Sequence, residues 1–228
     1  MAEFKGFPQI TLDFLRGLAA HNEKAWFEAH RADYEAGYTG PAFAFIETMG
    51  PRLRTIAPDV QFAPRVNGSL WRINRDARFS KDKSPYKTHL GLWFWHGERR
   101  AWDQPGFYVQ ISPERVFFAV GMHNLQKPEL ERFRYAVQHK RAGNGLLAAV
   151  EKVRAAGPYT IGEKTRKKPP RGFEAEGERA EYLLYEGLIA MHELPAESAL
   201  AEDFADTCFT HFSNMWPLGQ WLMAEVAA

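Results

Sequence analysis

The sequence predicts an α+β fold, with a central and mainly antiparallel sheet that is flanked by helices. Apolar residues recur at helical spacing in the first and last thirds of the 228-residue chain. In the middle third the spacing changes to the two-residue alternation of strands. Strand and helix patterns do not alternate regularly, which disfavours an α/β fold. At this length we expect a single domain over residues 1–228.

The N-terminal third is predicted to be helical. Thr11 is a good N-cap residue, and it precedes four apolar residues that share one helical face: Leu12, Phe14, Leu15 and Leu18. Asn22 is placed to cap a second helix that carries Trp26 and Phe27.

Two glycines and a proline predict where the next helix ends and begins. Gly37 and Gly40 are expected to interrupt the helical pattern. Pro41 suits the first turn of a third helix, because a residue at that position needs no amide hydrogen for the helix ladder.

The middle third predicts strands near residues 69–75 and 89–96 and an antiparallel hairpin at 107–120. Large apolar residues alternate with other residues along both arms of that hairpin. Residues 112–115, which read S-P-E-R, form a short polar link between the arms.

The last third returns to helical patterns. Pro128 is expected to open a helix, and a long final helix is predicted over 199–226. Between them the pattern indicates a short helix near 178–185 and one more strand at 188–194.

Gly143 and Gly145 begin a G-x-G-x-x-A pattern that resembles a dinucleotide-binding fingerprint. That fingerprint requires a preceding strand, whereas here a helical pattern precedes the glycines. We therefore interpret the two glycines as a turn between helices and reject a dinucleotide site.

The charge of the chain is concentrated in two segments. Residues 72–88 contain six basic and two acidic residues, and residues 164–171 contain five basic residues and no acidic one. Subtracting the +4 and +5 of these segments from the net +1 of the chain leaves −8 for the remainder. Basic segments on an acidic body attract anions to particular places rather than to the whole surface.

Composition also argues against disulfide-bonded, secreted and membrane-spanning classes of protein. The chain has one cysteine, Cys208, so an intramolecular disulfide is excluded, and a packed thiol is expected there. The N-terminal residues lack an apolar signal-peptide core, and no apolar run approaches membrane-spanning length. We expect a cytoplasmic protein with no membrane partner.

The segment at 72–88 is the strongest candidate for a binding site. Arginine binds phosphate or carboxylate with a planar fork, and lysine adds a mobile point charge. The candidate ligand-binding residues are Arg72, Arg75, Arg78, Lys81, Lys83, Tyr86, Lys87 and, from the second basic segment, Arg171. On an extended backbone Arg75 faces the core and needs a partner, which Asp76 or Asp82 can supply. If a reaction occurs, Asp76 is the best local candidate for a general base.

Aromatic residues near this segment leave a second interpretation open. Rings on strands that face away from the helices would be available to stack on nucleic-acid bases, although such rings more often form a core. The rings in question are Trp71, Trp93, Trp95, Trp102, Phe107 and Tyr108. The histidines show no spacing that is typical of a metal site, so no metal is predicted.

Residues 72–87 resemble the motif R-I-x-R-D-x-R-F-S-K-D-K-S-P-Y-K of a widespread bacterial and fungal family known as a domain of unknown function. Other elements are similar too: F-K-G-F at 4–7, Asn22 with W-F at 26–27, P-G-F-Y at 105–108 and P-P-R-G-F at 169–173. The family usually has His-Pro shortly after the last element, where this chain has Gly177 and Glu178. The resemblance implies an α+β domain and supplies no activity, cofactor or catalytic residue.

We therefore expect the chain to bind a phosphorylated or other anionic small molecule through residues 72–88, with catalysis left open and no cofactor assigned. Two alternatives remain open. The first is a non-enzymatic nucleic-acid-binding module, and the second is a purely structural ion-pair network with the functional site elsewhere. The sequence does not decide whether residues 72–88 and 164–171 meet in space.

Overall fold

The computed structural model describes residues 4–78, 80–97, 103–162 and 164–227. The chain forms two compact units, and each unit draws on three separate stretches of sequence. Unit 1 consists of residues 1–94, 108–117 and 193–209, and unit 2 of residues 95–107, 118–192 and 210–228. The expectation of a single domain stays a prediction.

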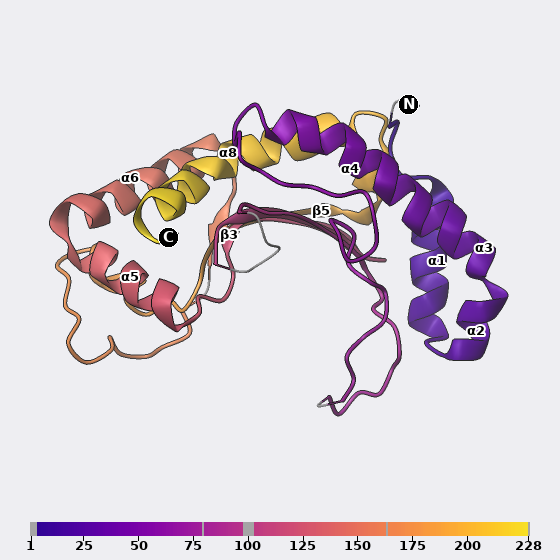
Figure 1. Ribbon diagram of the computed structural model, residues 1–228, viewed down its shortest axis with the longest axis horizontal. Helices are drawn as coiled ribbons and strands as arrows, with labels where there is room; N and C mark the ends of the chain where they lie inside the picture. The colour runs from indigo at the N-terminus through magenta and orange to yellow at the C-terminus, as the bar shows by residue number, and fades with distance from the viewer. Residues whose placement is uncertain (1–3, 79, 98–102, 163, 228) are drawn as a thin grey trace. The chain divides into compact units, whose positions relative to one another are not determined.

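Five strands form one antiparallel sheet, so the α+β prediction is confirmed (Figure 1). In sheet order they are β1 (Leu90–Phe94), β2 (Gly106–Ile111), β3 (Arg115–Met122), β5 (Leu188–Pro195) and β4 (Thr160–Ile161). The predicted hairpin is β2–β3, and its link closes with a hydrogen bond of 2.9 Å from the Ser112 amide to the Arg115 carbonyl. β4 was not predicted, because two residues are too few to show a period.

The N-terminal helices all belong to unit 1. They are α1 (Gln9–Ala20), α2 (Lys24–Ala29), α3 (Arg31–Tyr34), a π-helical turn η1 (Glu35–Thr39) and α4 (Gly40–Leu53). The predicted N-caps were wrong, since Pro8 and Glu23 take those positions. Thr11 lies inside α1, where its buried hydroxyl donates to the Gly37 carbonyl.

Gly37 does not interrupt the helix as predicted. The chain passes from α3 through η1 into α4 without leaving helical structure. A Cβ atom on Gly37 would lie 2.9 Å from the Ile10 carbonyl oxygen, so the glycine serves the close approach of η1 to α1. Pro41 occupies the first turn of α4, as the sequence predicts.

The predicted strand at 69–75 is reduced to single bridges. Leu70 pairs with Leu92 of β1, and Asn74 pairs with Tyr86 further along. The Trp71 amide donates to the Gly91 carbonyl at 3.0 Å, and the Trp93 amide donates to the Ser69 carbonyl at 2.9 Å. Residues 69–71 therefore run beside β1 for a short distance before the chain leaves the sheet.

Unit 2 contains α5 (Lys127–Gln138), α6 (Lys140–Ala156) and α7 (Arg179–Tyr182), with a proline in the first turn of α5 as predicted. Gly143 and Gly145 were predicted to form an interhelical turn, but both lie inside α6, and the chain turns at His139 instead. The helix predicted over 199–226 is divided between a 3₁₀ turn η2 (Ala196–Leu200) and α8 (Phe204–Glu225). Cys208 is fully buried, and burial raises the pKa of its thiol.

Each unit is built around aromatic side chains. In unit 1 the ring of Phe45 on α4 lies 6.4 Å from Phe94 on β1 and 5.8 Å from Phe204. In unit 2 the ring of Trp216 lies 4.7 Å from Phe107, and His96 stacks on the same indole at 5.2 Å. Of the helices that the structure describes, none is long and apolar enough to cross a membrane.

Candidate functional site

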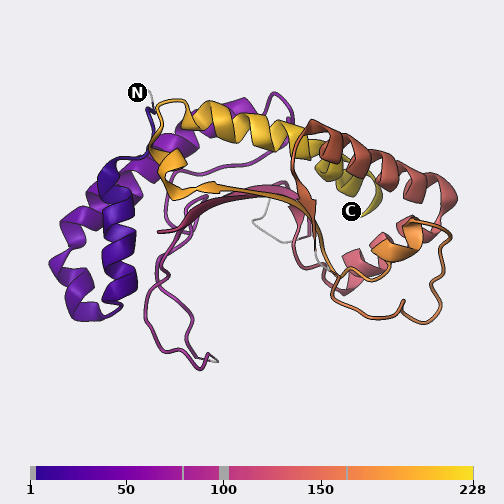
Figure 2. The same cartoon turned by 180° about the vertical axis from the view of Figure 1, so that it is seen from behind.

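Residues 72–88, called the basic loop below, extend away from β1 as a long ribbon of two paired arms (Figures 1 and 2). The arms are joined at their base by a hydrogen bond of 2.7 Å from the Lys87 amide to the Ile73 carbonyl. The next bond joins the Arg75 amide to the Pro85 carbonyl at 2.9 Å. Further out, Nζ of Lys83 donates to the Ala77 carbonyl at 3.0 Å.

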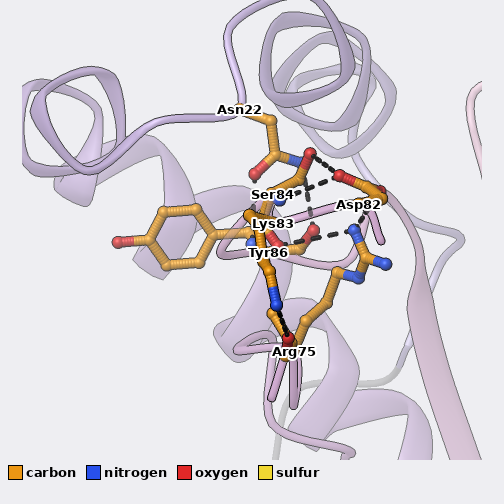
Figure 3. Close-up of polar contacts among 7 residues, drawn as sticks. Asn22, Arg75, Asp82, Lys83, Ser84 and Tyr86 are labelled. Carbon is orange, nitrogen blue, oxygen red and sulfur yellow. Dashed lines mark hydrogen bonds and ion pairs between the residues drawn. The ribbon is translucent and has the colours of Figure 1, made fainter. Parts of the chain in front are cut away.

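Asp82 holds the two arms together from within the loop (Figure 3). One carboxylate oxygen accepts the Ser84 hydroxyl at 2.6 Å and the Ser84 amide at 2.9 Å, and the other forms an ion pair with Arg75. These donors, Ser84 first and then Arg75, hold the pKa of Asp82 well below its usual range. The prediction that Asp76 or Asp82 partners Arg75 is confirmed, with Asp82 as the partner.

Asp76 is also committed to a partner. Its two oxygens accept hydrogen bonds from Nε of Arg78 at 2.9 Å and from Nη2 at 2.7 Å. These bonds lower the pKa of the Asp76 carboxyl, and the charge of Arg72 adds to the effect. A carboxylate with a lowered pKa is a weak base, so this geometry gives no support to Asp76 as a general base.

The base of the loop is fixed to the helices by Asn22 and Phe27. The Asn22 side chain accepts from the Tyr86 amide at 3.1 Å and donates to the Tyr86 carbonyl at 3.0 Å. The Tyr86 ring stacks on Phe27 with 4.5 Å between centroids and points away from Asp82 (Figure 3). Burial raises the pKa of the Tyr86 hydroxyl. Tyr86, predicted as a ligand-binding residue, therefore anchors the loop in this structure.

Three exposed cations of the loop have no ion-pair partner in the described part of the chain. Arg72, Lys81 and Lys83 form no ion pair with any residue that the structure describes. Lys87 lies at the base, where its ammonium donates to the Arg72 carbonyl at 3.0 Å and sits 5.0 Å from the centre of the Trp71 ring. Arg78 is paired with Asp76, yet 76% of its side chain is exposed.

The predicted site residues fall in both units. Seven of them lie in the basic loop of unit 1, whereas Arg171 lies in an exposed turn of unit 2. In that second segment Lys164 pairs with Glu181 at 3.2 Å and Arg166 pairs with Glu186 at 3.0 Å. Phe79 and Trp102, which entered the sequence argument, lie outside the described residues.

Comparison with known protein families shows to which of them the chain is related. The sequence profile of the family described as conserved hypothetical protein (DUF2461) matches residues 10–221, which is nearly the whole chain. The chain belongs to the DUF2461 family. No curated protein matches it.

For this DUF2461 member the family description names no activity, so the chemistry of the site has to be argued from geometry. The sequence argument missed the role of Asn22 in holding the loop. A signal was present in the resemblance, since Asn22 and Phe27 both belong to the N-x-x-x-W-F element and both contact Tyr86 of the long motif.

Proposed function

We propose that this protein binds a phosphorylated ligand through its basic loop. The observation that carries the proposal is that three exposed cations, Arg72, Lys81 and Lys83, form no ion pair with the described residues and lie on a loop that is braced from within. Both carboxylates of the loop form their hydrogen bonds and ion pairs with Arg75, Arg78 and Ser84, so neither forms an ion pair with these cations.

The bracing supports binding because a pre-ordered loop loses little conformational entropy when a ligand arrives. Charge supports it as well, since the loop attracts anions while the chain outside the two basic segments is acidic. Whether a reaction follows binding is left open, and the cytoplasmic location expected from the sequence remains a prediction.

The test is a thermal unfolding series with tripolyphosphate at low salt. At a hundredfold excess over its dissociation constant a ligand stabilises a protein by about 2.7 kcal/mol. For a chain of this size the melting temperature should rise by roughly 5–10 °C. The triple variant Arg72→Gln, Lys81→Gln, Lys83→Gln should lose most of this rise.

A matched control removes the same charge elsewhere. Lys24, Lys140 and Lys152 are exposed and form no ion pair in the described part of the chain, so their triple change to Gln should keep the rise. Absence of a shift in the unchanged protein, or equal loss in both triple variants, would contradict the proposal. A triple loop variant that unfolds several kcal/mol more easily would instead indicate a purely structural loop.

A further inference from the structure

A row of three aromatic rings crosses the sheet beside the basic loop, within unit 1. The row consists of Trp71, next to β1, Tyr108 on β2 and Phe117 on β3. The centres of the Trp71 and Tyr108 rings are 5.3 Å apart, and those of Tyr108 and Phe117 are 6.3 Å apart. The three rings therefore form one contact series that runs from the base of the loop, across β1, to β2 and β3.

Gly91 makes this row possible. It lies in β1, between the segment that carries Trp71 and the strand that carries Tyr108. A Cβ atom at position 91 would lie 2.9 Å from the Tyr108 hydroxyl oxygen. Because glycine has no side chain there, the indole and the phenol meet across the strand.

The row occupies the face of the sheet opposite α4. Residues that alternate with it, Leu92 and Phe94 on β1 and Val109 on β2, are fully buried, and Phe94 packs against Phe45 of α4. The rings of the row are only half-buried. A face that is aromatic and partly exposed suits the stacking of planar groups.

The row also carries a polar group. The Tyr108 hydroxyl donates to Oε1 of Gln110 at 2.9 Å. The amide nitrogen of Gln110 keeps two N–H donors, which meet no acceptor within the described residues. Donors beside stacked rings are suited to the edges of bases.

The cations of the loop are spread along its length rather than gathered at one point. Arg72 and Lys87 lie at the base, Lys83 lies beside Ala77 further out, and Lys81 lies beyond that pair. Six steps of extended chain, from residue 72 to residue 78, span about 20 Å. Because a phosphate oxygen must approach a donor to about 3 Å, one phosphate group does not reach both ends of the loop. A ligand with several phosphates in series does.

We infer that the ligand of the basic loop is a single-stranded nucleic acid, whose backbone follows the loop while its bases stack on Trp71, Tyr108 and Phe117. This inference rests on the proposed function and names the class of ligand. Bases in a duplex are already stacked on each other, so the aromatic row selects single strands. The acidic remainder of the chain limits the site to a short stretch of about 4–8 nucleotides.

The experiment compares four probes on the full chain by anisotropy and calorimetry: labelled (dT)8, labelled (U)8, thymidine monophosphate and tripolyphosphate. At least one octamer should bind ten times more tightly than thymidine monophosphate. The octamer that binds more tightly shows whether the site prefers a deoxyribose or a ribose strand. Trp71→Ala should weaken octamer binding by about 5- to 100-fold, the usual effect of one stacking ring. The same change should leave tripolyphosphate binding within twofold.

Phe117→Leu provides a second variant that keeps most of the apolar volume and should also weaken octamer binding. The matched control is Tyr135→Ala, which removes an aromatic side chain that is 58% exposed in unit 2 and should change nothing.

The outcomes separate the two proposals. If tripolyphosphate binds but thymidine monophosphate binds as tightly as the octamers, the ligand class is wrong and the proposed function stands. The same holds if both ring variants bind octamers normally. If neither tripolyphosphate nor an octamer binds, the proposed function itself fails.

Discussion

Among single residues, Asn22 shows how a side chain that the sequence offers as a helix cap is used over a longer distance. Its amide forms both a donor and an acceptor bond with the backbone of Tyr86, 64 residues away. This pairing completes the hydrogen bonding of two backbone groups that no strand neighbour serves. The hydrogen bonding at the base of the basic loop therefore depends on a side chain from outside the loop.

We expect Asn22→Ala to lower the free energy of unfolding by about 1–3 kcal/mol, because two hydrogen bonds of about 0.5–1.5 kcal/mol each are lost. The midpoint of urea denaturation measures this loss. Asn144→Ala is the control, since Asn144 is exposed on α6 and should change stability by less than about 0.5 kcal/mol. Equal midpoints for the two variants would show that the Asn22 bonds do not stabilise the fold.

At the scale of elements, α6 contains two glycines in different surroundings. A Cβ atom on Gly143 would lie 2.5 Å from the Val137 carbonyl oxygen and 2.7 Å from Cδ of Arg179. A Cβ atom on Gly145 would meet Trp221 at 3.4 Å, which is an ordinary van der Waals contact. The first glycine is therefore required by the close approach of α5 and α7, and the second is not.

Substitution of these glycines by alanine should have opposite effects. Gly143→Ala should destabilise the protein by about 1–3 kcal/mol, because the Val137 backbone has to move. Gly145→Ala should stabilise it by up to about 1 kcal/mol, because alanine is the better helix former. Denaturant midpoints of the pair check this, and a gain in stability at both positions would refute the packing argument.

The elements that the sequence predicts correctly are those decided locally. Pro41 and Pro128 begin helices because the proline ring fixes the first turn, and the β2–β3 hairpin follows from its two-residue period. Thr11 and Gly143 were misread because contacts with the backbone of another helical element, the carbonyls of Gly37 and Val137, decide their roles. A single sequence does not contain those contacts.

The same distinction between local patterns and contacts with other elements applies to the candidate site. The partner of Arg75 followed from strand alternation, whereas the inward direction of the Tyr86 ring depends on Phe27, and the aromatic row depends on Gly91.

At the scale of the whole molecule, two half-buried histidines connect stability to pH. Burial lowers the pKa of His89 to about 4, with the charge of Lys87 adding to it. Burial lowers the pKa of His211 to about 4 as well, with His192 adding to it. Asn214 donates to the Tyr159 hydroxyl at 2.9 Å, and that hydroxyl forms a hydrogen bond of 3.0 Å with Nδ1 of His211.

Stability should therefore fall as the pH falls from about 6.5 towards 4. Over this range the histidines take up protons in the unfolded chain and stay neutral in the folded one. We expect a loss of about 1–2 kcal/mol from His89 at pH 5, and a smaller loss from the more exposed His211 because water screens its charge, measured by urea denaturation. The double variant His89→Asn, His211→Asn should flatten the dependence between pH 7 and 5. An unaltered slope in that variant would assign the effect to other groups.

The division of the chain between the two units affects how the protein is made. Unit 1 needs residues 193–209, and unit 2 needs residues 210–228, so neither unit is encoded by one continuous stretch. During synthesis the chain leaves the ribosome N-terminus first, at about 5–20 residues per second. Unit 1 therefore stays incomplete until residue 209 has left the exit tunnel, and unit 2 needs residues 210–228 after that. The edge of β3 that pairs with β5 thus stays unpaired until residues 188–195 have been made, and it is during this interval that chaperone binding would matter most to the yield.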